Sequence, residues 1–247
     1  MKITFIILAF LALTIQAAEQ SMKPNIVIIF TDDQGYADLA CYGNKLNKTP
    51  RLDQLAKEGT RFTSFYSQTV CGPSRSALLT GRQPIRSGGW GMPAEEITWA
   101  ELIVKAGYQT ACIGKWDVSN RRAVIPRMPN AQGFDYFYGA LGANDNGVVK
   151  LHENNEDAGS TRDMDGLIKL YTDKSIDYLK NKRDPKKPFV LYLAHTMMHT
   201  IIDASQKFRG KSKGGLYGDV VEEFDFETGR LLDTLDELKL ADNTLVI

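Results

Sequence analysis

The hydrophobic residues of this chain gather in short continuous runs, and three of these runs predict strands. Residues 25–31, 109–113 and 188–194 are mostly apolar and contain many β-branched side chains. Continuous runs of this kind are typical of strands buried on both faces of a parallel sheet. A further run that begins at Thr244 predicts the opening of another such strand.

Segments with helical character separate these runs. Residues 51–58 and 98–106 are each followed by glycine, a common residue just past a helix end, and residues 163–182 and 217–240 predict longer helices. Strands that alternate with helices predict an α/β fold with a mainly parallel central sheet flanked by helices. Residues 119–166 are rich in Asn, Gly and Pro with weak periodicity, and we expect a long loop there, over one face.

The first residues have the pattern of an export signal. Lys2 precedes an apolar run over residues 3–15, and two small residues, Ala17 and Ala18, follow it. The apolar run is shorter than the ~20 residues that span a bilayer. We therefore predict a signal peptide over residues 1–18, no stable membrane insertion, and a mature protein that is secreted or periplasmic.

Charge and composition narrow the possible functions. Thirty Lys and Arg balance thirty Asp and Glu, so no basic excess is available to neutralise a nucleic-acid backbone, and we expect no nucleic-acid partner. A chain of 247 residues with 43% hydrophobic content can bury one large core. Three cysteines, Cys41, Cys71 and Cys112, are too few for a disulfide framework, and their odd number leaves at least one thiol free.

Two adjacent acids, Asp32 and Asp33, follow the first predicted strand. Ligands of open parallel sheets bind beyond the carboxyl ends of the strands. Neighbouring carboxylates repel each other unless a cation compensates, and a hard divalent ion, calcium before magnesium, is the natural compensator. The structural alternative is a turn or helix cap that uses one acid and leaves the other in water.

Cys71 lies where a short helix should begin. Pro73 suits the first helical position and Gly81 suits the far cap, so we expect the helix to start directly after Cys71. A helix amino end favours an anion and lowers the pKa of a thiol. Arg75 adds a planar, permanently charged fork about one turn further on. The pattern indicates an oxyanion-binding cysteine site; an inert cysteine beside a helix start explains neither Arg75 nor Pro73.

The segment from Cys71 to Arg82 resembles the sulfatase signature C-x-P-S-R followed by L-T-G-R. Residues 25–35, 107–116 and 195–199 match three further blocks in the family's order, so the resemblance to the formylglycine-dependent, arylsulfatase-like sulfatases covers nearly the whole mature chain. It implies the alkaline-phosphatase-like sulfatase fold and a sulfatase catalytic domain over residues 24–247.

The resemblance also implies a reaction. In that family the cysteine, here Cys71, is oxidised to formylglycine by a formylglycine-generating enzyme or its equivalent. One hydroxyl of the hydrated aldehyde attacks sulfur, and the other then loses its proton and expels sulfate. Calcium held by Asp32, Asp33 and residue 71 would offset the developing charge, and Arg75 would orient the hydrate.

Two further side chains are assigned to the sulfate by resemblance. Lys115, at the end of a predicted strand, would bind the sulfate. His199, rather than His195, falls where relatives place the acid that protonates the leaving oxygen, or a sulfate ligand. A solvated surface lysine and a pair of loop histidines are the structural alternatives. The implied substrate is a sulfate ester of a small aryl compound or of a glycan.

The sequence departs from the family's pattern in three places. Asp117 replaces a histidine that relatives commonly carry two positions after the lysine, and Met198 stands where many have proline. Relatives also carry, after the strand at Thr244, an Asp-Asn pair, a lysine and a small C-terminal domain, so we expect the domain to be truncated at its C-terminal end. With half its ligands calcium should bind weakly, because it normally takes ~6–8 oxygens.

Three other functions stay open at this point. A related phosphatase or phosphonate hydrolase is one, although such enzymes use serine or threonine, or keep additional metal ligands, in place of C-x-P-S-R. A truncated, non-catalytic fragment that binds sulfated ligands is another. A thiol enzyme that pairs Cys71 with His199 is the third.

Overall fold

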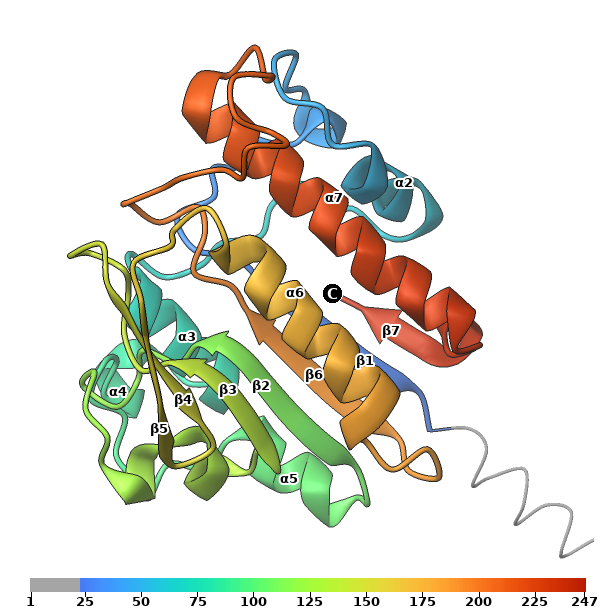
Figure 1. Ribbon diagram of the computed structural model, residues 1–247. Helices are drawn as coiled ribbons and strands as arrows, with labels where there is room; N and C mark the ends of the chain where they lie inside the picture. Colours follow the sequence, from blue (N-terminus) through green and yellow to red (C-terminus); the bar gives the residue numbers. More distant parts are fainter. Residues whose placement is uncertain (1–22) are drawn as a thin grey trace, which may run out of the picture.

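The computed structural model describes residues 23–247, so the predicted signal peptide lies outside the described residues. Seven strands form one sheet in the order β5-β4-β3-β2-β6-β1-β7 (Figure 1). Their bounds are β1 Asn25–Phe30, β2 Gln109–Lys115, β3 Tyr136–Ala140, β4 Val149–Glu153, β5 Glu156–Thr161, β6 Phe189–Ala194 and β7 Thr244–Val246. Strands β3, β2, β6, β1 and β7 pair in parallel with their neighbours. Strands β4 and β5 extend the sheet beyond β3 as an antiparallel hairpin.

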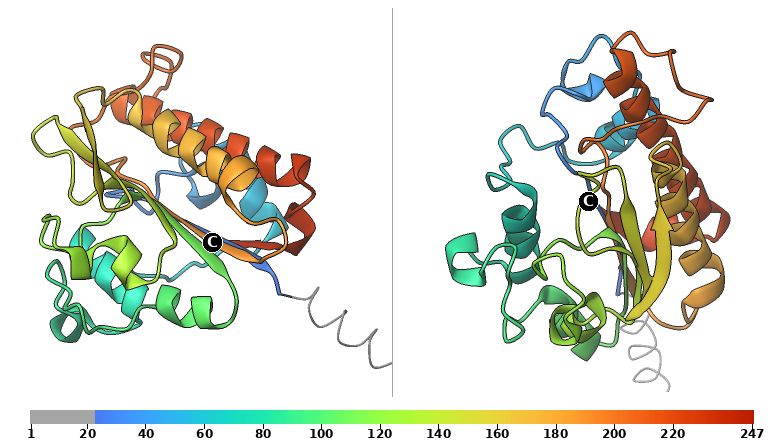
Figure 2. Two further views of the ribbon diagram at one scale, coloured as in Figure 1. Left: turned by 60° about the horizontal axis from the view of Figure 1, so that its bottom comes forward. Right: turned by 60° about the vertical axis from the view of Figure 1, so that its left-hand side comes forward.

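Helices cover both faces of the sheet, which confirms the predicted α/β class. The α-helices are α2 Pro50–Glu58, α3 Cys71–Thr80, α4 Pro84–Ser87, α5 Trp99–Lys105, α6 Leu167–Asp177 and α7 Gly215–Glu237. Short turns of other helix types are η1 Ala40–Tyr42, η2 Ile125–Arg127, η3 Pro129–Gln132, η4 Tyr178–Lys182 and η5 Ala241–Asn243. Helices α6 and α7 lie side by side on one face, and α3, α4 and α5 lie on the other (Figure 2). Every helix within residues 23–247 is too short or too polar to cross a bilayer.

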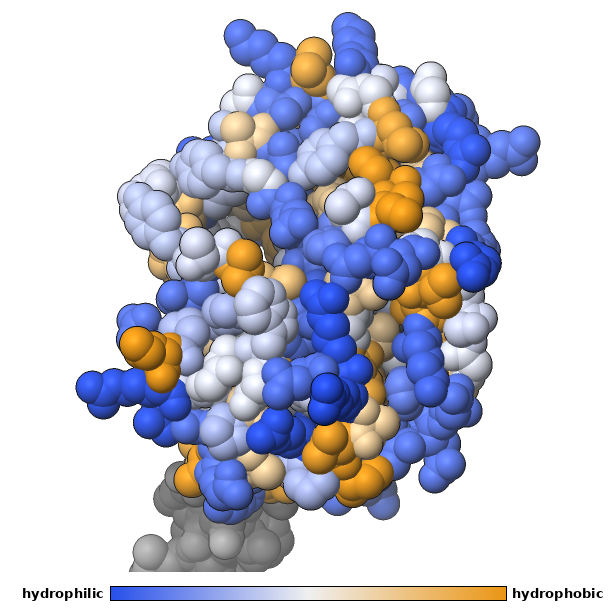
Figure 3. All heavy atoms as spheres, turned by 90° about the vertical axis from the view of Figure 1, so that its left-hand side faces the viewer, coloured by the Kyte–Doolittle hydropathy of each residue, from blue (hydrophilic) through white to orange (hydrophobic). Residues whose placement is uncertain are grey.

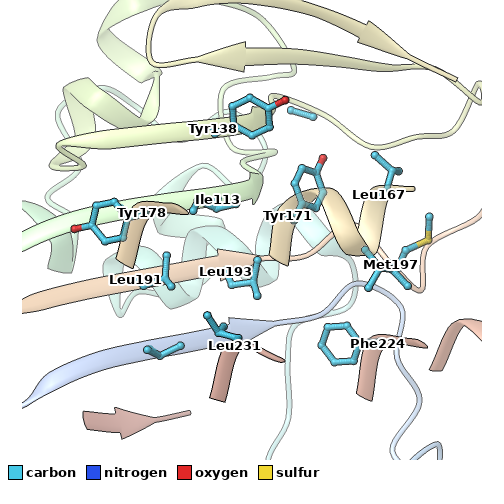
Figure 4. Packing of buried hydrophobic residues seen from close by; sticks show 14 of the residues in the cluster. Ile113, Tyr138, Leu167, Tyr171, Tyr178, Leu191, Leu193, Met197, Phe224 and Leu231 are labelled. Atoms are coloured by element: carbon cyan, nitrogen blue, oxygen red, sulfur yellow. The ribbon is translucent and has the colours of Figure 1, made fainter. Parts of the chain in front are cut away.

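A separate hydrophobic core fills the space on each side of the sheet. On the α6 and α7 side, Ile113 and Leu193 from the sheet meet Tyr171 from α6 and Phe224 from α7 (Figure 4). The opposite core is built around Leu79, Met92, Trp116, Phe134 and Tyr192. Complete burial of such a side chain stabilises the fold by about 1.5–3 kcal/mol, so the central strands are held rigidly from both faces.

The predicted long loop over residues 119–166 is wrong, because β3, β4 and β5 lie there. Strand β3 is buried throughout, but it has only five residues, and β5 is polar and exposed along nearly all of its length. An edge hairpin of this kind carries little hydrophobic periodicity, which is the signal from which strands are recognised in a sequence.

The helix near Cys71 also differs in detail from the prediction. Helix α3 begins at Cys71 itself, with Val70 at the N-cap, so Pro73 is the third helical residue and not the first. Gly81 forms the predicted left-handed cap, with φ 66°. Cys71 therefore lies within the first turn of the helix.

Candidate active site

The carboxyl ends of the parallel strands β1, β2 and β6 bring the predicted site residues to one edge of the sheet. Strand β6 lies between β2 and β1. The loops after β1 and β6 are joined by the Asp32 amide, which donates to the Met197 carbonyl at 3.1 Å. Helix α3, on the adjoining face, carries Cys71 and Arg75 at its amino end.

A buried ion network occupies the centre of this edge. Lys115 Nζ donates to Asp32 Oδ2 at 2.5 Å, and Arg75 Nη2 lies 3.7 Å from the same oxygen. The side chains of Lys115 and Arg75 are completely buried, and that of Asp32 is 3% exposed. Arg75 also donates to the carbonyls of Lys115, at 2.9 Å, and His195, at 3.0 Å, so it joins the ends of β2 and β6. Three residues predicted separately therefore act as one charged unit.

Asp117 is the centre of a second part of the network, which the sequence reasoning missed. Its buried carboxylate lies 3.4 Å from Lys115 Nζ and accepts hydrogen bonds at 3.1 Å from both Trp90 Nε1 and Arg121 Nε. In the sequence, Asp117 stands out only as the replacement of a histidine. Arg121, four residues later in the sequence, has the opposite charge and could have indicated that Asp117 takes part in an ion pair.

Cys71 is partly buried beside this network, and its acidity differs from the prediction. Burial is the largest cause that raises the pKa of the Cys71 thiol; Lys115 lowers this pKa, and Asp117 and Asp32 raise it again. The expectation of a lowered thiol pKa at the helix amino end is therefore wrong in direction. Loss of water and two neighbouring carboxylates outweigh the effect of the lysine. A thiol that is held protonated is poorly suited to a thiol enzyme.

The two histidines after β6 have different surroundings. His195 is fully buried, with its ring edge-on to Tyr171 and Phe224, and burial followed by the nearby Arg75 lowers its pKa to about 3. It accepts a hydrogen bond from the Met197 amide at Nδ1, so its role is structural. His199, the histidine assigned to the sulfate, instead faces the other charged groups of the edge.

His199 links two of the acids at this edge. Its Nε2 lies 3.5 Å from Asp145 and 3.9 Å from Asp33, and Asp145 in turn accepts a hydrogen bond from Arg121 at 2.7 Å. Acidic side chains then alternate with basic or imidazole side chains, at 2.5–3.9 Å, in the order Asp33, His199, Asp145, Arg121, Asp117, Lys115, Asp32 and Arg75. All six residues that the sequence assigned to the site border this arrangement or belong to it.

A cavity of about 290 Å³ is lined by Asp32, Asp33, Gln34 and Cys71, so both acids and the sulfur share one space. Carboxylates are hard oxygen ligands of the kind that calcium prefers. The donors therefore suit calcium in kind. They are few, because the described part of the chain has no group of three or more His, Cys, Asp or Glu arranged to hold a metal.

Comparison with known proteins places this arrangement in a class. The fold is shared with a solved structure of Ps i-CgsB in complex with k-i-k-neocarrahexaose, at a TM-score of 0.80 and 29% identity, over 91% of this chain and 57% of that one. The alkaline-phosphatase-like sulfatase fold expected from the sequence is thus confirmed. The family model described as Sulfatase matches residues 24–247, and the chain belongs to the sulfatase family.

Curated relatives agree with this assignment. The chain is 34% identical to N-acetylgalactosamine-6-sulfatase of Canis lupus familiaris, over 93% of this chain and 50% of the relative. It is 35% identical to arylsulfatase A of Homo sapiens, over 91% of this chain and 51% of the relative. The chain spans about half the length of the curated relatives it matches.

Proposed function

We propose that this chain carries the reacting group and most sulfate-binding groups of a sulfuric ester hydrolase, which cleaves a sulfate ester through formylglycine made from Cys71, with calcium. The observation that carries the proposal is the convergence of Cys71, Lys115, Arg75 and Asp32 at the carboxyl ends of β1 and β2. Membership of the sulfatase family supports the same reaction.

Lys115 and Arg75 would attract the sulfate and stabilise negative charge that develops on its oxygens. Both are shielded from water, where a charge acts more strongly than on the surface. Asp32 holds the lysine ammonium at 2.5 Å, so this cation is positioned before a substrate arrives. Such preorganisation avoids a rearrangement cost during the reaction.

The modified residue 71 would supply a pair of hydroxyls, one to attack sulfur and one to release the sulfate in a later step. Asp32, Asp33 and residue 71 would hold calcium, which supplies neutralising charge at the sulfate oxygens. His199 would donate the proton to the leaving oxygen: its Nδ1 lies 3.1 Å from Asn144 Oδ1, so its Nε2 is the nitrogen directed at Asp33 and Asp145.

The substrate, partner and location follow from the same proposal. The relatives' names refer to aryl sulfates and to sulfated N-acetylgalactosamine, so the substrate is proposed to be a sulfated small molecule or glycan. A formylglycine-generating enzyme or its equivalent would modify Cys71. The mature protein is proposed to be secreted or periplasmic.

The test is the chemical state of residue 71. The full chain is expressed with and without a formylglycine-generating enzyme and cleaved with trypsin, and the peptide Phe62–Arg75 is analysed by mass spectrometry. We expect an aldehyde at position 71, together with hydrolysis of 4-nitrocatechol sulfate, only after co-expression. A C71A variant is the matched control. Activity that persists with an unmodified thiol would refute the formylglycine route.

A second function is favoured by one observation. In residues 23–247 no three His, Cys, Asp or Glu side chains are arranged as a metal site, so Asp32, Asp33 and unmodified Cys71 by themselves would bind calcium weakly. A non-catalytic protein that binds sulfated ligands through Lys115 and Arg75 is therefore the alternative. An aldehyde at position 71 without any hydrolysis would favour it.

A further inference from the structure

Four buried side chains at the candidate active site carry charges that balance one another. Lys115 and Arg75 are positive, Asp32 and Asp117 are negative, and each side chain is at most 3% exposed. Asp32 contacts both cations, and Asp117 lies 3.4 Å from Lys115 Nζ. Without Asp117 these buried residues would hold one positive charge in excess, and an uncompensated buried charge is costly. Asp117 therefore makes the buried group neutral.

Asp117 has a further cationic neighbour that lies at the surface. Arg121 donates from Nε to Asp117 at 3.1 Å and from Nη1 to Asp145 at 2.7 Å. The side chains of Arg121 and Asp145 are 44% and 43% exposed, so water and salt screen both charges. Because these two charges also neutralise each other, the field that an anion meets near Lys115 comes mainly from the buried group.

The Asp117 carboxylate is held in place before any anion binds. Trp90 Nε1 donates at 3.1 Å to Oδ2, the oxygen that faces Lys115. The indole ring in turn packs against Gly72, where an added Cβ would lie 2.0 Å from the ring. Asp117 itself has φ 56°, in the left-handed region that Asp and Asn tolerate better than most residues. The fold therefore sets the position of this charge, and asparagine can replace Asp117 without added backbone strain.

A fixed negative charge next to Lys115 acts differently on the substrate and on the product. Lys115 is a proposed sulfate ligand, so a bound sulfate group lies close to Asp117. A sulfate ester carries one negative charge, whereas free sulfate at neutral pH carries two. Coulomb repulsion is proportional to charge, so Asp117 should weaken binding of free sulfate about twice as much, in free energy, as binding of the ester. Water screens this repulsion little, because the Asp117 side chain is fully buried.

We propose that Asp117 is a positioning residue that keeps the sulfate site electrically neutral, so that the site retains the singly charged ester and releases the doubly charged sulfate. The inference rests on the proposed function and adds to it how the product leaves. A purely structural role, in which Asp117 only supports Lys115 and Trp90, predicts the opposite result when the charge is removed. Loss of such support would weaken binding of both anions.

The test measures anion binding without turnover. The full chain is expressed without a formylglycine-generating enzyme, so that Cys71 stays a thiol, and is titrated by calorimetry with sodium sulfate and with sodium methyl sulfate at neutral pH and constant ionic strength. Asp117→Asn removes the charge, and Asp117→Gly, which also suits a left-handed backbone, is a second variant without it. Trp90→Phe keeps the charge but removes the hydrogen bond to Asp117. Asp157→Asn controls for total charge, because Asp157 is 59% exposed on β5, on a largely hydrophilic side of the molecule (Figure 3).

Both Asp117 variants are expected to bind sulfate about tenfold more tightly than the unchanged protein, and methyl sulfate only about threefold more tightly, because half the charge gives half the free energy. Trp90→Phe and Asp157→Asn should keep the unchanged protein's ratio of the two affinities. Equal tightening for both anions, unchanged or weaker sulfate binding by both Asp117 variants, or no sulfate binding by any of the proteins would each overturn the proposal. The measurement uses the thiol form, so failure of the formylglycine route would be seen separately in the mass spectrum.

Discussion

Replacement of Asp32 by asparagine tests the buried ion network directly. The carboxylate is 3% exposed, lies 2.5 Å from Lys115 Nζ and 3.7 Å from Arg75 Nη2, and is the nearest acid to both. Asparagine keeps the volume but removes the charge, which leaves two buried cations poorly compensated. Removal of one partner of a buried pair costs about 3–5 kcal/mol. Because Lys115 keeps Asp117 at 3.4 Å, we expect a loss at the low end of this range, about 3 kcal/mol.

Urea denaturation of the full chain, followed by circular dichroism, gives the free energy of unfolding of D32N and of the unchanged protein. Lys180→Met is the matched control, since Lys180 forms a 2.9 Å ion pair with Glu237 whose side chains are 40% and 62% exposed. An exposed pair is worth about 0–1 kcal/mol. If D32N lost no more stability than the control, the network would not be desolvated in the way described, and the positioning assigned to Lys115 would fail.

Three further predictions concern protonation and metal binding. Burial lowers the pKa of His195 to about 3, so below about pH 6.5 the unfolded chain binds a proton at this residue that the folded protein does not bind. The free energy of unfolding should therefore fall as the pH drops below about 6.5, and urea midpoints of a His195→Gln variant should depend less on pH over that range. Should His199 donate the proton to the leaving oxygen, His199→Ala will lower kcat far more for an alkyl sulfate than for 4-nitrocatechol sulfate, whose leaving group needs no proton; equal losses would contradict this role. Calcium should bind with a Kd in the range of about 10⁻⁴–10⁻³ M. Calorimetry should detect no calcium binding to the Asp33→Ala variant, which should fold normally because the Asp33 side chain is 57% exposed.

The sequence alone was sufficient to predict the central strands and the polar groups that follow them. Strands β2 and β6 are buried on both faces and β1 is buried or half-buried along its length, and the continuous apolar runs of the sequence reflect this packing. Polar residues directly after such runs meet at one edge of a parallel sheet, which is why Asp32 and Asp33 could be placed there from the pattern, whereas the role of Lys115 came from the resemblance. Cys71 and Arg75 were expected together at a helix amino end from the local pattern, and the family signature added their roles in the reaction.

Only the tertiary structure decided the surroundings of these groups. Strands β4 and β5 carry little local signal because the edge of a sheet needs few apolar residues. The contacts of Asp145 with His199 and with Arg121 join segments that are distant in sequence, so they form only when the chain is folded. The direction of the Cys71 pKa likewise depends on the water that folding removes and on carboxylates distant in sequence. Charges interact through space and not along the chain, so their balance is set only once the strands are assembled.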